Sequence, residues 1–270
     1  MTVSYRNLTT LEEFADVVEL ERRIWGTGYE DVVPVSILAI AVIRGGVLIG
    51  AFDAERMVGF VYSLPAIKDG KPTQWSHMLG VVDDYRSAGV GAELKRLQRE
   101  RAMAMGLDLI EWTYDPMQAL NAHLNFTKLG VVVEEYEVNV YGVSHSPLHG
   151  GNPTDRFVAE WFVREPRVEQ RLGGAVPLAS VLTVEPALRT KPSGEWLEPL
   201  SPDLSLDARR ISVAIPTGFT GMLAGAPDLA MAWRMTTREL FTTYFGRGYR
   251  AVEFFLDRAA RKGTYLLIKN

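Results

Sequence analysis

The strongest constraint on the fold is the order in which helical and strand-like segments alternate along the first 145 residues. Thr10 and Glu13 fit a capping box, which predicts a helix over 10–25 that Gly26 ends. Two apolar runs joined by the polar turn DAER predict a β-hairpin. The series begins with helices at 10–25 and 35–45, a hairpin at 47–64 and a strand at 74–82. It continues with a helix that ends near 105, a strand at 107–115, a helix at 118–130 and a strand at 131–142. This alternation is typical of an α/β domain.

A second half follows a loop rich in Gly, Pro, Ser and Asn at 143–155, VSHSPLHGGNPTD. We therefore expect one domain over 1–145 and a second α/β half over 155–270. That half contains strand-like runs (FVAEWFV, ASVLTV, RRISVAIP, AVEFFL and TYLLIK) and a long helix near 228–246. GLDLIEWTYD at 106–115 shares Gly, Glu and Asp with GYRAVEFFLD at 248–257. Two interpretations stay open, namely unrelated helix–strand units or a degenerate repeat of the first domain.

Composition excludes several classes of protein and site. The net charge of −4 gives no global basic field for nucleic acid or anionic membrane. With no cysteine, disulfides, thiolate metal sites and cysteine nucleophiles are excluded. The first residues lack the pattern of a secretory signal, and the most apolar stretch, 32–43, is too short to cross a bilayer. We expect a cytoplasmic protein without a metal ion.

Two glycines stand where the helix after residue 82 should begin, in the stretch DDYRSAGVGAELKRLQRERAMAMG. The first turn of a helix has unpaired N–H groups and a favourable dipole for anions. Gly89 and Gly91 have no Cβ, so a phosphate can approach the backbone, and Arg86 could add charge-assisted hydrogen bonds. The alternative is a helix turn that merely packs tightly on the sheet, and spacing alone does not decide between them.

Arg86-Ser-Ala-Gly89-Val-Gly91 resembles the Arg/Gln-x-x-Gly-x-Gly/Ala signature of the GNAT superfamily of acyl-CoA N-acyltransferases. The preceding strand exit, Val81 to Arg86, and the segment NAHLNFTKLG are also similar to that family. The resemblance covers about residues 3–142 and implies a mixed central sheet flanked by helices. WTYDPMQALNAHLNFTKLG with PTDRFVAEW further resembles a long-chained GNAT subgroup, some members of which are associated with amino-acid racemases and N-acylate amino acids, including with succinyl groups.

The resemblance implies how coenzyme A would bind. Backbone N–H groups of the glycine turn would hold the pyrophosphate, and a strand would pair with the pantetheine arm while one of its N–H groups stabilises the oxyanion. Lys95, Arg96 and Arg99 could reach the outer phosphate, or could simply form a solvated helix face. The residues implied are Ser87, Ala88, Gly89, Val90, Gly91 and Ala92 for the turn, with Arg86 beside it, and Leu79, Gly80, Val81 and Val82 for the strand.

The expected reaction is direct attack of an amine on the thioester, which needs a base. His77 is the first candidate, because an imidazole suits proton transfer at neutral pH; the alternative is a hydrogen-bonded strand histidine. Glu111 is the second, either as a site residue or as half of a structural pair. GNAT enzymes often carry a tyrosine as general acid four residues before the last glycine of the final helix, but this chain has Phe126 there. Tyr114 or Tyr141 would have to replace it.

Three further residues are candidates for substrate contacts. Asn121 and Asn125 are spaced i and i+4, and either could bond the pantetheine amides. Arg156 offers the bidentate geometry that a carboxylate requires, for an amino acid or a succinyl tail. Its neighbour Asp155 gives an equally weighted structural explanation.

The leading hypothesis is an acyl-CoA N-acyltransferase that moves an acetyl or succinyl group to a small-molecule amine such as an amino acid. The expected partners are that amine, the acyl-CoA and a second copy of the chain, with no nucleic acid and no membrane. The first alternative is a non-catalytic acyl-CoA sensor, which Phe126 favours. The second is another nucleotide-binding module, although the chain lacks the Lys-Ser/Thr of a P-loop.

Overall fold

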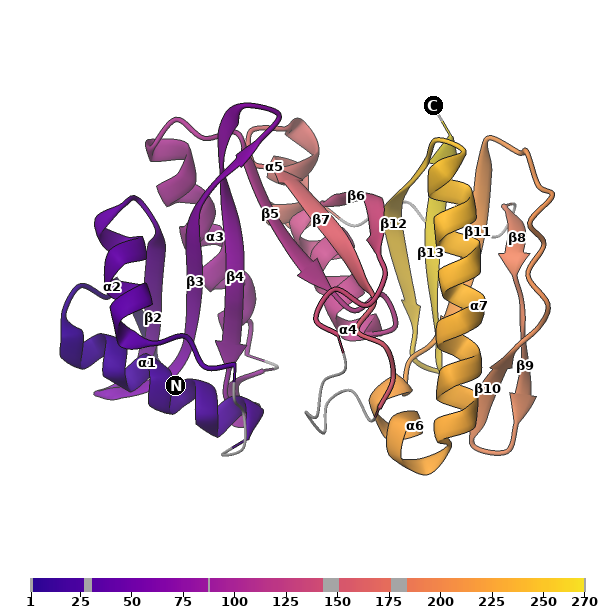
Figure 1. The fold of residues 1–270 in the computed structure, drawn as a ribbon, viewed down its shortest axis with the longest axis horizontal. Helices are drawn as coiled ribbons and strands as arrows, with labels where there is room; N and C mark the ends of the chain where they lie inside the picture. Colours follow the sequence, from indigo (N-terminus) through magenta and orange to yellow (C-terminus); the bar gives the residue numbers. More distant parts are fainter. Residues whose placement is uncertain (1, 27–30, 87, 143–150, 176–183, 270) are drawn as a thin grey trace. The chain divides into compact units, whose positions relative to one another are not determined.

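The computed structural model describes residues 2–26, 31–86, 88–142, 151–175 and 184–269 (Figure 1). Its contacts group the chain into two compact units. The first contains Met1–Trp112 with Phe162–Glu165, and the second contains Thr113–Trp161 with Pro166–Asn270.

The first unit is a mixed sheet with helices packed on it. Its strands follow the order β1-β2-β3-β4-β5, and neighbours are antiparallel except β4 and β5, which are parallel. The elements are β1 (Val3–Asn7), α1 (Leu11–Trp25), α2 (Val35–Ile43), β2 (Val47–Asp53), β3 (Arg56–Lys68), β4 (Lys71–Val81), the 3₁₀ turn η1 (Asp83–Tyr85), α3 (Val90–Ala104) and β5 (Leu109–Tyr114). The helix, hairpin and strand segments predicted for this region are confirmed.

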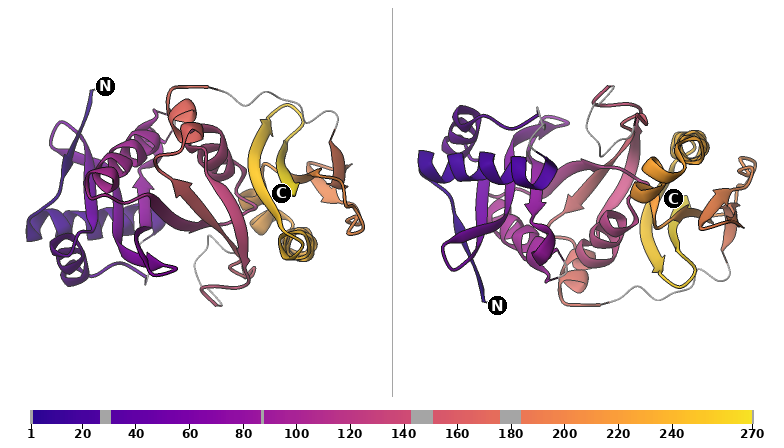
Figure 2. Two further views of the ribbon diagram at one scale, coloured as in Figure 1. Left: turned by 90° about the horizontal axis from the view of Figure 1, so that it is seen from above. Right: turned by 90° about the horizontal axis from the view of Figure 1, so that it is seen from below.

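Opposite faces of this sheet carry different helices, with α1 and α2 on one side and α3 on the other (Figure 2). A Cβ added at Gly80 of β4 would lie 2.8 Å from Ile24 of α1, so this glycine allows α1 to approach the strand closely. Its neighbours Leu79 and Val81 point the other way, towards Gly91 of α3. Strand β4 is therefore positioned by helices on both faces.

The second unit holds the remaining strands in the order β7-β6-β12-β13-β11-β8, with the hairpin β9-β10 following β8 in the chain. Strands β8 and β11 run parallel, whereas β7 with β6, β6 with β12, β12 with β13 and β13 with β11 run antiparallel. The elements are α4 (Ala119–Ala122), the π-helix η2 (His123–Leu129), β6 (Val132–Glu137), β7 (Arg156–Phe162), α5 (Pro166–Leu172), β8 (Glu185–Leu188), β9 (Thr190–Ser193), β10 (Trp196–Pro199), β11 (Arg210–Pro216), α6 (Phe219–Gly225), α7 (Pro227–Gly246), β12 (Tyr249–Asp257) and β13 (Lys262–Lys269). Most of the predicted strand ASVLTV lies outside the described residues.

The strand pairs β6-β7 and β12-β13 of the second unit are similar in two local features, a preceding glycine and a register shift. Gly130 and Gly248, each with positive φ, follow a helix and precede β6 and β12. In both pairs the register with the next strand shifts three to five residues after this glycine. The shift lies between Val133 and Glu135 in β6 and between Ala251 and Glu253 in β12. In the register shift that follows its glycine, the strand at 249–257 is similar to β6, whereas the sequence echo matched it with 107–115. The equivalent residues Val133 and Ala251 also pair with each other, where β6 and β12 run antiparallel.

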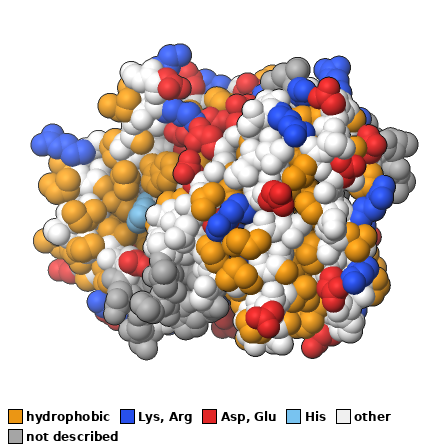
Figure 3. Space-filling view, turned by 45° about the vertical axis from the view of Figure 1, so that its right-hand side comes forward, with side chains coloured by type: hydrophobic (Ala, Val, Ile, Leu, Met, Phe, Trp, Pro, Cys, Tyr) orange, Lys and Arg blue, Asp and Glu red, His pale blue; other side chains and the backbone are white. Residues whose placement is uncertain are grey.

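Charge is mixed on the molecular surface, since acidic and basic side chains are interspersed on the face drawn in Figure 3. Within the described residues, no helix is long and apolar enough to cross a membrane.

Candidate acyl-coenzyme A site

The backbone amides in the first turn of α3 have no acceptor among the described residues. The first internal hydrogen bond of the helix runs from Glu93 N–H to Gly89 O, at 3.1 Å, so the amides of Val90, Gly91 and Ala92 have no acceptor within the helix. Gly89 is the N-cap residue in a left-handed conformation, with φ of 80°, and provides no side-chain cap. This turn has the features that favour an anion.

Neither glycine of this turn is required by tight packing. A Cβ added at Gly89 would meet nothing within 4 Å, and one added at Gly91 would lie 3.7 Å from Leu79, an ordinary contact. Gly89 is explained by its positive φ, which other residues adopt only with strain. Tight packing therefore does not explain either glycine.

Arg86 and Ala88 already have partners within the turn. The Arg86 guanidinium is exposed, donates to Val81 O at 3.2 Å and forms an ion pair of 2.8 Å with Asp83. The N–H of Ala88 donates to Tyr85 O at 3.1 Å. Ser87 lies outside the described residues. The amides that follow Ala88 are therefore the ones available to an anion.

Strand β4 is paired along only part of one edge. It pairs with β3 over its whole length, whereas its pairing with β5 joins Gln74 to Ile110 and Trp75 to Glu111. The predicted pantetheine strand, 79–82, follows this paired part, and Val82 N–H donates to Val58 O on the β3 side at 3.0 Å.

A β-bulge in β4 sets His77 apart. The register with β3 shifts so that Ser76 faces Ser63 and Met78 faces Tyr62, which leaves His77 as the extra residue. Its side chain is exposed at the surface, and its ring meets the Tyr62 ring edge-on at 5.9 Å between centroids. Partial desolvation lowers the pKa of His77, so the imidazole is neutral at pH 7.

Glu111 forms a buried ion pair. Its carboxylate lies 2.9 Å from the Lys68 ammonium, and 8% of its side chain is exposed. Of the two interpretations of Glu111, the structural pair is therefore the one whose contacts are present.

The tyrosines proposed as general acid lie in the second unit. Tyr114 is buried, and its ring meets that of Phe157 at 5.8 Å between centroids. Burial, with a smaller effect of Tyr265, raises the pKa of Tyr114 well above its ordinary value. Tyr141 is exposed and its hydroxyl lies 2.8 Å from that of Thr113. Phe126 is fully buried and packs on Tyr265.

The segment with the two asparagines is not a regular α-helix. After Ala122 the chain continues as a π-helix to Leu129, which Gly130 ends with φ of 76°. The wider turn changes the direction of each later side chain. Asn121 is exposed whereas Asn125 is buried, so the i, i+4 spacing does not place them on one face as the sequence suggested.

The cations of α3 are not arranged as either sequence interpretation expected. Lys95 and Arg99 are buried, with 2% and 6% exposed. Lys95 donates to Ser76 at 2.8 Å, and Arg99 donates to Val163 O at 2.6 Å. Arg96 pairs with Glu93 at 2.5 Å. Lys95 and Arg99 therefore anchor the helix to the rest of its unit, and the outer-phosphate role is corrected for both, whereas Arg96 pairs with residues of α3 itself.

The sequence reasoning missed Glu21, which it treated as a polar interruption in the apolar face of the first helix. The side chain of Glu21 is fully buried, and Oε2 accepts the Val33 N–H at 2.9 Å. Its Oε1 and the hydroxyl of Tyr62, also fully buried, have no partner among the described residues. Desolvation raises the pKa of Glu21 to about 7. The only signal in the sequence was that interruption of the apolar pattern.

Arg156 begins β7 in the second unit and is buried, with 9% exposed. Its guanidinium donates one hydrogen bond of 3.1 Å to the backbone oxygen of Asp155 and lies 5.3 Å from the centre of the Tyr141 ring. The Asp155 carboxylate instead accepts two hydrogen bonds from Arg238, at 2.7 and 2.8 Å. The competing explanation, a side-chain pair between residues 155 and 156, is thus not present.

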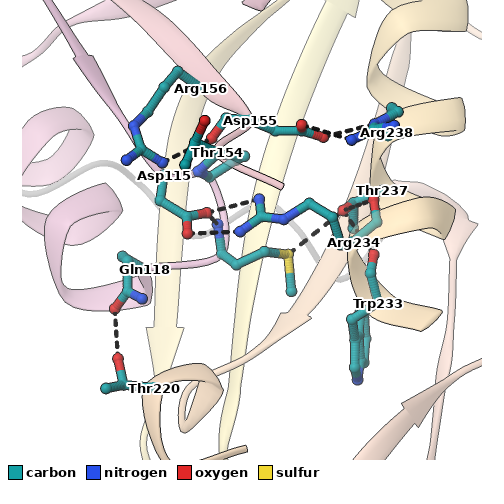
Figure 4. Close-up of polar contacts among 12 residues, drawn as sticks. Asp115, Gln118, Thr154, Asp155, Arg156, Thr220, Trp233, Arg234, Thr237 and Arg238 are labelled. Atoms are coloured by element: carbon teal, nitrogen blue, oxygen red, sulfur yellow. Dashed lines mark hydrogen bonds and ion pairs between the residues drawn. The ribbon is translucent and has the colours of Figure 1, made fainter. Parts of the chain in front are cut away.

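A second ion pair completes this cluster (Figure 4). Asp115 accepts two hydrogen bonds from Arg234, at 2.9 and 2.7 Å, which is the bidentate arrangement. Both aspartates are therefore committed to other arginines. Among the described residues, no carboxylate forms an ion pair with Arg156, whose pKa burial lowers.

A scan against models of known protein families and a search of curated proteins both found no match. Solved structures are similar at the level of the backbone. The protein yncA from Salmonella typhimurium, solved with acetyl-CoA as its cofactor, is 16% identical with a TM-score of 0.50, over 61% of this chain and 96% of that chain. The NatC complex bound to Gag peptide and CoA is 15% identical with a TM-score of 0.48, over 59% and 98%.

A third structure, from Desulfovibrio desulfuricans and described as an acetyltransferase of the GNAT family, is 13% identical with a TM-score of 0.47, over 60% and 99%. At these sequence identities, the similarity between this chain and the solved structures is a similarity of fold. The GNAT-like mixed sheet flanked by helices, predicted from the sequence, is confirmed by the structure of yncA. About two fifths of the chain lies outside it, and the long-chained subgroup stays a prediction.

Among the described residues, no three His, Asp or Glu side chains gather closely enough to hold a metal ion.

Proposed function

We propose that the protein is an acyl-CoA-dependent N-acyltransferase that moves an acetyl or succinyl group to the amine of a small molecule such as an amino acid. The observation that carries this proposal is the bare first turn of α3, Val90 to Ala92, directly after the part of β4 that pairs only with β3. A diphosphate is compatible with the turn, because its amides have no acceptor within the helix and a Cβ added at Gly89 would meet only open space.

The residues of this unit have complementary roles in the transfer. The turn binds the diphosphate of the acyl-CoA, and the edge of β4 pairs with the amide groups of the pantetheine arm. The proposed oxyanion contact is a backbone N–H at the bulge, where His77 is the extra residue relative to β3; it would stabilise the oxyanion that forms on the thioester carbonyl. The amine then bonds to that carbon and the thiol leaves.

A charge placed in the turn tests the diphosphate site without weakening the helix. Ala92 occupies the third helical position, where a carboxylate is favourable to the helix dipole. Ala92→Glu should therefore keep or raise the melting temperature while it raises the Kd for coenzyme A at least about tenfold. Ala92→Gln, of similar size without charge, is the matched control and should have the smaller effect. Equal affinities in a calorimetric titration of the three proteins would refute the diphosphate site.

An assay of thiol release distinguishes an enzyme from a non-catalytic sensor. Protein, acetyl-CoA or succinyl-CoA and a pool of amino acids are mixed, and thiol release is followed against a reaction without amine. Amine-dependent release supports the enzyme. Binding of coenzyme A without release would favour the sensor.

Arg156 is the proposed contact for a substrate carboxylate. The surroundings of Arg156 within the second unit support this, since it is a buried guanidinium whose neighbouring carboxylates are both engaged by other arginines. Arg156→Lys retains the charge but loses the bidentate geometry. It should raise the KM for the acceptor more than it lowers kcat, and an unchanged KM would refute the contact.

We also propose that the C-terminal half is a degenerate repeat without a coenzyme site. Parallel strands β4 and β5 are followed by a helix, β6 and β7, and parallel strands β8 and β11 are followed by helices, β12 and β13. The first parallel pair is joined by α3, whereas the second is joined by the hairpin β9-β10. One coenzyme A should therefore bind per chain in a calorimetric titration, and a stoichiometry of two would contradict the proposal.

A further inference from the structure

Arg156 belongs to a cluster of charged side chains in the second unit that contains three guanidiniums and two carboxylates (Figure 4). Arg234 binds the Asp115 carboxylate through two hydrogen bonds. Arg238 binds the Asp155 carboxylate in the same way. Each of these two pairs carries no net charge, and Arg156 is the third guanidinium. The cluster therefore has an excess of one positive charge.

The surroundings of Arg156 do not neutralise this charge. Within the described part of the chain, its guanidinium donates one hydrogen bond, to the backbone oxygen of Asp155. Burial lowers the pKa of Arg156, and the two carboxylates that oppose this effect are those of Asp115 and Asp155. Both are paired with other arginines. A cation that is nine-tenths buried is costly to keep without an anion beside it, so the cluster is incomplete by one negative charge.

The guanidinium of Arg156 can be reached from the surface. Among the arginines that the structure describes, a fully buried nitrogen without a partner occurs in Arg171, Arg234 and Arg250, but not in Arg156. The N–H groups of Arg156 that have no protein acceptor are therefore open to solvent. The exposed ring of Tyr141 lies over this guanidinium, with 5.3 Å between the ring centre and Cζ. A small ligand can thus meet the unpaired charge beside an aromatic ring.

We propose that this site takes one carboxylate and excludes a second, so that the acceptor is an amino acid with an uncharged side chain rather than aspartate or glutamate. This selection rests on the proposed function, in which Arg156 contacts a substrate carboxylate. It adds the class of amino acid that the second unit admits.

The selection follows from the charge balance of the cluster. One carboxylate on Arg156 makes the cluster neutral. A second carboxylate close to the first would find Arg234 and Arg238 already directing two hydrogen bonds each to an aspartate. It would lose hydration without gaining a cation, and it would lie near two negative groups. A desolvated, unpaired charge is a strong means of rejecting a competing ligand.

Asparagine and aspartate are matched probes, because they have nearly the same shape and differ by one negative charge. Glutamine and glutamate form a second pair, and alanine, leucine and phenylalanine extend the uncharged set. Calorimetric titration of the unchanged protein at pH 7 gives the Kd of each. At least one uncharged amino acid should bind, and aspartate and glutamate should bind at least about tenfold more weakly than the tightest of them.

Three variants separate charge selection from a structural effect. Arg156→Gln should weaken binding of the uncharged amino acids at least about tenfold. Asp155→Asn removes a negative charge beside Arg238 and leaves the cluster with an excess of two positive charges, so it should shift the preference between asparagine and aspartate at least about tenfold towards aspartate. Arg209→Gln, an exposed arginine of the same unit, is the matched control and should change neither quantity.

The possible results lead to different conclusions. Aspartate or glutamate bound as tightly as the best uncharged amino acid would overturn the selection, and so would the absence of binding by every amino acid. If Asp155→Asn does not fold, Asp115→Asn, which releases Arg234 instead, provides the same comparison, and an unshifted preference there would overturn the charge argument. Selective binding without thiol release from acetyl-CoA or succinyl-CoA would leave the monocarboxylate site in place, while the acceptor role would fail together with the proposed function.

Discussion

The ammonium group of Lys95 lies 3.5 Å from the centre of the Trp112 ring, within the first unit. It also donates hydrogen bonds to Ser76 at 2.8 Å and to Gln98 at 3.1 Å. A basic side chain in the sequence motif of a phosphate site is thus used to hold α3 on the sheet. The contacts of Lys95 hold the helix on the sheet, so the proposed anion site would consist of backbone amides rather than of lysine charge.

Lys95→Met tests this assignment. Burial lowers the pKa of Lys95 well below 10.5, so in alkaline solution the unfolded chain binds more protons than the folded one, and stability rises with pH up to about 10.5. The variant should lose this rise, because it removes the titrating group. Ser76 and Gln98 keep each other as partners at 3.0 Å. Urea unfolding between pH 7 and pH 10 measures the effect, and coenzyme A affinity should stay within about twofold. A Kd raised about tenfold would restore a phosphate role to Lys95.

The two glycines of the turn should respond oppositely to alanine. Gly89→Ala forces an alanine into a positive φ and should destabilise the fold by about 1 kcal/mol. Gly91→Ala adds a Cβ at ordinary contact distance inside a helix and should stabilise it by about 0.5 to 1 kcal/mol. Thermal unfolding of the two variants decides this, and equal effects would contradict the left-handed conformation of Gly89 and the helical one of Gly91.

Glu21 should make stability fall as pH rises. Its pKa is raised from 4.5 to about 7, so between these values the folded protein binds more protons than the unfolded chain, and the slope of stability against pH is negative. The loss is complete above pH 7 and amounts to something on the order of 3 kcal/mol. Glu21→Gln should remove this effect, so that it is more stable than the unchanged protein at pH 8 and about equally stable at pH 4. A variant less stable at pH 8 would show that the carboxylate is better satisfied than its contacts indicate.

Arg234 and Arg156 should differ sharply in their contribution to stability. Arg234→Gln leaves the Asp115 carboxylate without its bidentate partner and should cost about 3 to 5 kcal/mol. Arg156→Gln removes one hydrogen bond to a backbone oxygen and should cost no more than about 1 kcal/mol. Urea denaturation of both variants gives the comparison. Similar losses would mean that Arg156 is a structural residue and would weaken its assignment to a substrate.

Features fixed by neighbouring residues were predictable from the sequence. Thr10 and Glu13 form the expected capping box, in which Thr10 accepts the Glu13 N–H at 3.3 Å and Glu13 accepts the Thr10 N–H at 3.0 Å. Gly130 takes the left-handed conformation common at a helix end, whereas the positive φ of Gly89 at the N-cap of α3 was not expected from the sequence. The predicted features depend on backbone geometry over a few residues, which sequence spacing encodes directly.

Features that depend on distant partners were not predictable. The burial of Lys95 depends on Ser76 and Trp112, and the isolation of Glu21 depends on β3 packing over α1. The inserted residues of the π-helix after Ala122 leave no compositional mark, so the spacing of the asparagines gave the wrong face. Arg156 stays a prediction as a substrate contact; the pairing of Asp155 with Arg238, which the sequence did not indicate, removes only the side-chain pair with Asp155 as the competing explanation.

The pairing of Val133 with Ala251 places matching residues of two similar hairpins opposite each other, as an axis of twofold symmetry would. Many proteins obtain such an arrangement by bringing two identical subunits together. Here a single polypeptide supplies both sides, so the two sides are free to diverge. One hairpin can change its sequence while the other does not, and neither can lose its neighbour at low protein concentration.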